Sequence, residues 1–392
     1  MKLPDTKWRQ DGELQRLLRV LGAGEGETRY VGGSVRDTLL GLAVADVDLA
    51  TRLRPDEVMR RVESAGMKAV PTGLAHGTVT AVLRGKPVEI TTLRRDVSTD
   101  GRRATVAFTD DWREDAARRD FTINALSADP GTGEVFDYFD GLADLAAKRV
   151  RFIGDPLTRI AEDHLRILRF FRFHARFGTG APDEAGLQAC AARANDLMAL
   201  SRERISGELL RLLALPDPTP TVTIMIEQGI FRPIIPEITD ADPLGRLVEC
   251  EAEAGIPADP IRRLAALLPA EPAVAEAIAA RLRLSSRQGK RLASAANPDL
   301  AAPLPLAYRI GVEEAVDRLL LRGGDLTGLA DLQKWQPPAL PLRGGDLVAA
   351  GVTAGPDVAR LLRRIEERWV GENFPDESRV RAIMAEELAG GA

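Results

Sequence analysis

Two aspartates that lie two residues apart, Asp46 and Asp48, have a spacing that suggests chemistry. They occur in VADVDLAT, an apolar stretch typical of a strand, and residues i and i+2 of a strand project from one face. Adjacent carboxylates repel each other unless one is protonated or a cation lies between them. Mg²⁺ binds a few carboxylates and completes its shell with water and substrate phosphates. The pair therefore fits a Mg²⁺ site, and a solvated strand face is an equally good interpretation of these residues alone.

A pair of glycines thirteen residues earlier favours the metal site. Gly32 and Gly33 follow the predicted strand TRYV and precede a helix predicted to begin near Ser34. Glycine lets a phosphate approach the backbone, and a helix N-terminus attracts anions. Arg36 lies one turn into that helix and can bind a phosphate. The dinucleotide and P-loop fingerprints are absent, and a simple tight turn is the alternative interpretation.

Two further segments carry charged side chains beside apolar runs. Glu89, in VEITTLR, shares a predicted strand face with Thr91 and is either a third carboxylate or a solvated face residue. ARRDFTINAL, residues 117–126, places Arg119 and Asp120 before an apolar run. Asp120 suits a helix N-cap, and an arginine there can bind a triphosphate bidentately. A capped helix with a solvated basic turn is the alternative.

Charged residues recur at every third position within 151–178, a stretch for which the periodicity predicts one long helix. The repeating set is Asp163, Arg166, Arg169 and Arg172. Between residues 148 and 176 the chain has eight lysines and arginines but three acidic residues, although its net charge is −5. A solvated helix face mixes the two signs more evenly, so this basic cluster predicts a surface that faces phosphates.

The composition, 45% hydrophobic and 28% charged, is typical of a globular protein. No apolar run approaches the ~20 residues of a membrane span, and the polar N-terminus lacks the apolar core of a signal peptide, so we expect no membrane partner. Two widely separated cysteines, expected to be reduced, favour a cytoplasmic location. Three histidines and two cysteines do not supply a convincing zinc site, so we expect oxygen ligands for any metal.

The elements that must position these residues change type along the chain. Strand and helix signals mix up to about residue 150, and only helical signals continue beyond it. HGTVTAVL and KPVEITTL alternate as strands joined at Gly85, and RPDEVMRRVESAG predicts a helix between Pro55 and Gly66. The predicted fold class is therefore α+β, with an N-terminal head built on a mixed sheet with helices and an all-α remainder.

Several motifs, in a shared order, are similar to those of the class II tRNA nucleotidyltransferase and bacterial poly(A) polymerase family. The matching stretches are GGSVRD (32–37), DVDLAT (46–51), HGTVTAVL and VEITTLRRDVSTDGR (within 76–102), RRDFTINAL (118–126), EDHLRILRFFRF (162–173), RERISGELLRLL (202–213) and residues 344–369. The likeness covers nearly the whole chain. Within the family, the chain resembles the CCA-adding enzymes of alphaproteobacterial and mitochondrial type.

The resemblance implies a nucleotidyltransferase head (1–150), a nucleotide-selecting and RNA-binding neck (151–213), and a helical body and tail that bind tRNA (214–392). It implies Mg²⁺-dependent addition of C, C and A from CTP and ATP to the tRNA 3′ end without a nucleic-acid template. It implies that Asp46 and Asp48 hold the metal and act in catalysis. The implied nucleotide-binding residues are Gly33, Arg36, Arg119, Asp120, Asp163, Arg166, Arg169 and Arg172. Residues 95–113 match the family's flexible loop.

Asp163 and Arg166, predicted to lie three apart on one helix face, suit base selection. C and A both present an amine donor beside a ring nitrogen that accepts, whereas an ionised aspartate accepts and an arginine donates. A plain intrahelical ion pair is the alternative. For the whole chain the alternatives are a poly(A) polymerase, a partial enzyme that adds only CC or only A, and a non-catalytic RNA-binding protein. The intact D-x-D and the arginine stripe argue against the last.

Overall fold

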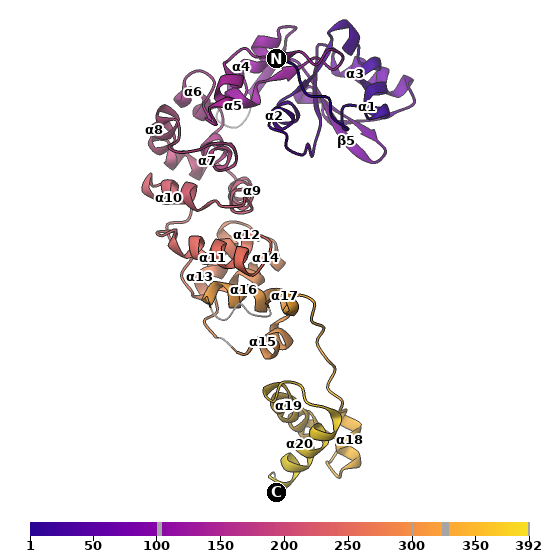
Figure 1. Cartoon of the computed structure of the whole chain (residues 1–392), viewed down its shortest axis with the longest axis vertical. Coiled ribbons are helices and arrows are strands. Elements are labelled where there is room, and N and C mark those ends of the chain that lie inside the picture. Colours follow the sequence, from indigo (N-terminus) through magenta and orange to yellow (C-terminus); the bar gives the residue numbers. More distant parts are fainter. Residues whose placement is uncertain (100–103, 300, 324–328, 391–392) are drawn as a thin grey trace. The chain divides into compact units, whose positions relative to one another are not determined.

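The computed structural model describes residues 1–99, 104–299, 301–323 and 329–390. The chain forms two compact units, each with its own core. The first comprises Met1–Leu212 and Pro220–Pro236, and the second comprises Leu213–Thr219 and Glu237–Ala392. Figure 1 shows the chain with many of its elements labelled.

A mixed seven-stranded sheet with the order β3-β4-β5-β2-β1-β8-β9 organises the first unit. Its strands are β1 (Thr28–Val31), β2 (Asp48–Thr51), β3 (Lys68–Gly73), β4 (Thr78–Leu83), β5 (Lys86–Thr92), β8 (Ser127–Ala128) and β9 (Val135–Phe136). Only β2 and β5 pair in parallel within it. The strands β6 (Arg94–Thr99) and β7 (Ala104–Phe108) form a separate hairpin. The segment predicted as a flexible loop falls on this hairpin, and its residues 100–103 lie outside the described residues.

The two faces of the sheet differ because strand residues alternate between them. Leu49 and Ile90, which are 1% and 0% exposed, lie on the core face. Helix α3 (Pro55–Ser64) packs on β3, β4 and β5, and α1 (Gly12–Val20) packs on α3. Asp48 and Glu89 are paired across β2 and β5, so both belong to the opposite face. The sheet therefore separates an apolar core from a face that carries carboxylates.

Helices make up most of the rest of this unit. They are α2 (Gly33–Leu39), α4 (Trp112–Ala117), α5 (Gly141–Ala146), α6 (Pro156–Glu162), α7 (Arg166–Phe177), α8 (Glu184–Ala192), α9 (Arg202–Leu213) and α10 (Thr219–Glu227). Short 3₁₀ helices cover Ala23–Glu25, Leu74–His76, Thr122–Asn124 and Ala194–Ala199. Buried rings of α7, Phe170 among them, stack on Phe121 and Phe152. Aromatic packing thus attaches α7 to the segments that come before β8 and after β9.

The prediction of one helix across 151–178 is wrong, because α6 and α7 are separated at Asp163. Asp163 has an extended backbone, with φ −153° and ψ 106°. Its carboxylate accepts a hydrogen bond from the backbone N–H of Leu165 at 3.1 Å. Aspartate competes with helical hydrogen bonding through such local bonds, and the chain here turns before α7 begins.

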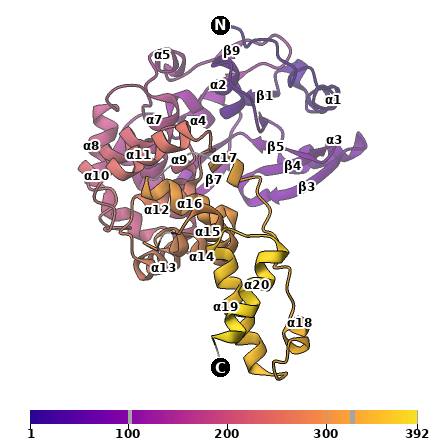
Figure 2. The ribbon, with the colours of Figure 1, turned by 60° about the horizontal axis from the view of Figure 1, so that its bottom comes forward.

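The second unit is helical throughout its described part, which confirms the predicted all-α remainder of an α+β fold. Its helices are α11 (Asp242–Glu253), α12 (Pro260–Ala266), α13 (Pro272–Arg281), α14 (Ser286–Ala295), α15 (Pro303–Ile310), α16 (Val312–Arg322), α17 (Leu329–Leu332), α18 (Gly344–Ala349), α19 (Pro356–Gly371) and α20 (Glu377–Ala389). Proline opens several of them, where its missing N–H has no cost. Figure 2 shows α19 and α20 side by side. The apolar core that they share includes the buried Trp369. In the described ranges, no helix combines the length and the apolarity that crossing a bilayer requires.

Candidate active site

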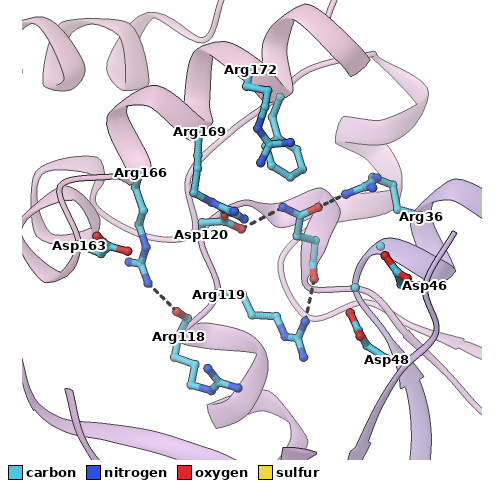
Figure 3. A pocket seen from close by; sticks show the side chains of 14 residues that line it. Arg36, Asp46, Asp48, Arg118, Arg119, Asp120, Asp163, Arg166, Arg169 and Arg172 are labelled. Atoms are coloured by element: carbon cyan, nitrogen blue, oxygen red, sulfur yellow. Dashed lines mark hydrogen bonds and ion pairs between the residues drawn. The ribbon is translucent and has the colours of Figure 1, made fainter. Parts of the chain in front are cut away.

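A pocket of about 610 Å³ in the first unit gathers the sequence-predicted side chains (Figure 3). All ten residues predicted for the site line it. The lining consists of Gly32, Gly33, Arg36, Asp46, Asp48, Arg118, Arg119, Asp120, Asn124, Asp163, Arg166, Arg169, Arg172 and Phe173. Residues more than a hundred positions apart in the sequence therefore meet in one place.

The paired aspartates form one side of this pocket (Figure 3). The prediction that both lie on a strand is wrong in part: Asp48 begins β2, while Asp46 precedes the strand and is exposed. Both still face the pocket. Burial, followed by the negative charge of Glu89, raises the pKa of Asp48, and Asp46 adds to this while Arg119 opposes it. Negative charge is thus in local excess, a condition that a bound cation relieves.

Glu89 lies directly opposite Asp48 in the parallel β2–β5 register but does not line the pocket. Within the described part of the chain, no group of three or more histidine, cysteine or acidic side chains gathers as a ready-made metal site. Mg²⁺ commonly uses one or two carboxylates and takes its other ligands from water and substrate phosphates. The Asp46 and Asp48 pair fits that requirement and would need a bound phosphate to complete it.

Gly32 allows a close approach between the backbone and an arginine. Its φ of +67° is a conformation that L side chains rarely adopt. A Cβ built on Gly32 would lie 3.0 Å from Nη1 of Arg119. The helix α2 follows immediately, from Gly33. Gly32 therefore keeps space beside Arg119, and the admission of a phosphate at this turn stays a prediction.

Arg36 and Arg119 differ in how firmly the protein holds them. Arg36 is 5% exposed, and it donates to Asp37 at 2.8 Å and to the side chain of Asn124. Burial lowers the pKa of Arg36, with Asp37 opposing the shift. Arg119 makes two long contacts, both 3.4 Å, to Asp115 and to the carbonyl of Asn124. Arg36 is thus committed to the framework, whereas Arg119 is held loosely enough to bind a ligand.

Asp120 is a framework residue rather than the predicted N-cap, since the cap position of the following 3₁₀ helix belongs to Phe121. Its carboxylate accepts from Arg169 at 2.8 and 2.5 Å and from the side chain of Asn124 at 2.9 Å. Burial would raise the pKa of Asp120, but the charge of Arg169 and these hydrogen bonds outweigh burial and lower it. Asn124 thereby links Asp120 to Arg36 (Figure 3).

Asp163 and Arg166 do not pair with each other, which corrects their predicted arrangement on one helix. Arg166 donates to Glu162 at 2.5 Å and to the carbonyl oxygen of Arg118 at 3.0 Å. Asp163 instead accepts from Arg204, a residue of α9. The physical reason is the break after α6, which turns Asp163 away from the helical direction. Both side chains nevertheless line the pocket, on its side opposite Asp46 and Asp48 (Figure 3).

The sequence did not predict four residues that belong to this site or support it. Asn124 and Phe173 line the pocket, and Arg204 and Glu208 stand behind it. Glu208 is 2% exposed and accepts from Arg172 Nε at 2.6 Å. A signal existed for Glu208, because a charged residue in the apolar run ISGELLRLL requires a partner. Nothing local identified Asn124.

The arrangement suits a polyanionic ligand that reacts beside two carboxylates. The lining holds six arginines against four aspartates, and Arg169 and Arg204 already neutralise two of those aspartates. Arginine binds phosphate groups bidentately. The arginine side of the pocket therefore suits phosphate groups, and the carboxylate side suits a cation.

Comparisons with known proteins agree with this chemistry. Residues 28–151 match the family model described as the poly A polymerase head domain. Residues 181–242 match the model described as a probable RNA and SrmB-binding site of polymerase A.

Relatives match over most of the chain. The mitochondrial CCA tRNA nucleotidyltransferase 1 of Mus musculus is 34% identical over 380 residues, which cover 91% of this chain and 86% of that protein. A CCA-adding enzyme of Lacticaseibacillus paracasei is 33% identical and matches over 95% of each chain. The crystal structure of the Bacillus stearothermophilus CCA-adding enzyme in complex with CTP has a TM-score of 0.77 at 25% identity, covering 97% of this chain and 99% of that one. By sequence and by fold, this chain belongs to the tRNA nucleotidyltransferase and poly(A) polymerase family.

Proposed function

We propose that this protein is a CCA-adding tRNA nucleotidyltransferase, which adds C, C and A from CTP and ATP to the tRNA 3′ end and releases pyrophosphate. One observation carries the proposal: a single pocket joins a carboxylate pair to an arginine-rich wall, in a chain that matches CCA-adding enzymes over nearly its whole length. We assign residues 1–150 to a catalytic head, 151–213 to a neck, and 214–392 to a tRNA-binding body and tail. Two free cysteines support a cytoplasmic place of action.

In this proposal Asp46 and Asp48 hold Mg²⁺. The excess of negative charge that raises the pKa of Asp48 supports this assignment. When bound, Mg²⁺ would help to ionise the attacking hydroxyl and neutralise charge on the departing phosphate oxygens. The other ligands would be substrate phosphates and water.

The chain's own residues act mainly by positioning. The tRNA 3′-hydroxyl attacks the α-phosphorus of the nucleotide, and pyrophosphate leaves in line. Phosphoryl transfer of this kind depends on alignment and charge neutralisation rather than on a covalent nucleophile. Arg119, held by two contacts of 3.4 Å, would bind the phosphates, and Gly33 would contribute the backbone at the start of α2. Asp120 and Arg36 hold the surrounding side chains in place.

We assign base selection to Asp163 and Arg166, as the sequence suggested, but from an altered geometry. Asp163 follows α6 with an extended backbone and Arg166 begins α7, so the two side chains do not project from one continuous helix. Asp163 accepts from the amine of C or A, and Arg166 donates to the neighbouring ring nitrogen. G and U present the reverse pattern and leave both groups unsatisfied.

The deciding experiment uses tRNA transcripts that end before CCA. We would supply CTP and ATP singly and together, and sequence the 3′ ends. The proposal predicts CC with CTP alone and CCA with both nucleotides. Runs of A on a generic RNA would instead identify a poly(A) polymerase, and CC with both nucleotides a partial enzyme. A protein that binds tRNA without releasing pyrophosphate would be a non-catalytic RNA-binding protein. Asp48→Asn serves as the inactive control.

A further inference from the structure

Helix α9 places two charged side chains behind the pocket without lining it. Arg204 and Glu208 lie four residues apart, so they project from one face of the helix. Arg204 Nη2 donates to both carboxylate oxygens of Asp163, at 3.0 and 2.7 Å. Glu208 accepts from Arg172 at 2.6 Å. Arg204 of α9 therefore holds Asp163 of the pocket. Glu208 of the same helix holds Arg172, another residue of the pocket.

Asp163 depends on such a partner because no helix fixes its direction. Its backbone is extended and its side chain is 31% exposed. Among the described residues, the other hydrogen bond to its carboxylate comes from the backbone N–H of Leu165, two positions further on. A carboxylate with one local bond can rotate about its side-chain torsions, and the bonds from Arg204 remove that freedom.

Arg204 orients Asp163 without consuming its capacity to bind. Oδ2 of Asp163 accepts from Arg204 alone in the described contacts, and a carboxylate oxygen has about two acceptor positions. Arg166 donates three hydrogen bonds to protein oxygens, and a guanidinium carries about five N–H donors. One acceptor position and some donors are therefore left for a base, on the same side of the pocket (Figure 3).

We propose that Arg204 is a positioning residue for base selection, which fixes the Asp163 carboxylate toward the amine of C or A. The inference rests on the proposed function. Arg204→Gln keeps a polar side chain but loses the charge and the paired bonds. We expect its preference for CTP over UTP to fall roughly tenfold, since a correctly aligned pair of hydrogen bonds discriminates between bases by about that factor. Its KM for CTP should rise while its KM for tRNA stays unchanged.

The experiment measures kcat and KM for CTP, ATP, UTP and GTP with tRNA transcripts that end before CCA. Arg204→Lys keeps the charge and should recover part of the selectivity. Arg193→Gln is the matched control, because Arg193 pairs with Asp196 at 2.6 Å and the two are 43% and 30% exposed, close to the 36% and 31% of Arg204 and Asp163. We expect parental selectivity in this control.

The outcomes separate this inference from the proposed function. If the parent adds no nucleotide to tRNA, the proposed function fails. If the parent is active and Arg204→Gln keeps its preference for CTP over UTP, the positioning role is refuted. Equal losses with all four nucleotides would also refute it, because they would reveal a general structural role. A thermal melt of each variant confirms that folded proteins are compared.

Discussion

The ion pair between Asp120 and Arg169 stabilises the folded protein, and the structure indicates how much free energy of unfolding its loss should cost. Asp120 is 8% exposed and accepts from Arg169 at 2.8 and 2.5 Å. Asp120→Asn keeps the side-chain shape but removes the charge. Removing one partner of a buried pair costs about 3–5 kcal/mol, and we expect about 3 kcal/mol, because the Arg169 side chain is 30% exposed and water can solvate the released guanidinium.

Hydrogen exchange measured by mass spectrometry tests this value within one unit of the chain. Amides of α7 near Phe170 should exchange roughly a hundredfold faster in Asp120→Asn, since about 1.4 kcal/mol corresponds to a factor of ten. Peptides from α19 serve as an internal control and should not change. Glu57→Gln, which breaks partly exposed pairs with Arg60 and Arg61 on α3, is the matched variant and should leave α7 unaffected. Equal exchange in the parent and Asp120→Asn would refute the reasoning.

The same pair has a defined pH dependence. The folded-state pKa of Asp120 is lowered, so its stabilising contribution is complete above the unfolded value of about 3.9 and shrinks as the pH falls through the folded value. The difference in α7 protection between the parent and Asp120→Asn should therefore stay constant from neutral pH to about 5 and narrow below about 4. A difference that instead grew with acidification would contradict the assigned charge state.

Three further outcomes follow from the site. Asp46→Ala or Asp48→Ala should abolish incorporation of both C and A while tRNA affinity, measured by filter binding, stays near the parental value; parental rates would exclude the metal role. Raising NaCl from about 50 to 200 mM should weaken tRNA binding roughly tenfold or more, because arginine contacts release counterions, and a flat dependence would argue against a phosphate-binding surface. Gly32→Ala should cost about 1–3 kcal/mol in a thermal melt because of its positive φ, and should raise the KM for CTP and ATP alike; unchanged values would show that the turn tolerates a side chain.

Local sequence patterns correctly predicted several strands and helices of the first unit. The alternation in HGTVTAVL and KPVEITTL corresponds to β4 and β5, and Pro55 and Gly66 bracket α3 as predicted. These signals suffice because a strand with one buried face, or a helix between proline and glycine, is determined by its own residues. The resemblance indicated that the distant motifs belong to one site. The pocket contains the ten residues assigned to that site but not Glu89, which comes from one of the same motifs.

Partners separated along the chain could not be predicted in this way. Arg169 binds a residue 49 positions away, Arg204 one 41 positions away, and Arg172 one 36 positions away. No local periodicity encodes such pairs. The missed helix break has the same origin, because Asp163 leaves helical geometry in a setting where Leu165 and Arg204 supply its bonds. Charged residues at every third position suggested one continuous helix, although the backbone is broken between α6 and α7.

These partners support the proposal that one pocket serves two bases. Arg36, Arg169 and Arg172 are each tied to a carboxylate, so they form a frame whose donors keep their directions. Buried ion pairs contribute little net stability, and fixing direction is the role by which they are best understood here. Arg119, with two contacts of 3.4 Å, lies outside this frame. In the proposed function, Asp163 and Arg166 would select the base while Arg119 would bind the phosphates, so a change from C to A need not alter where the phosphates bind.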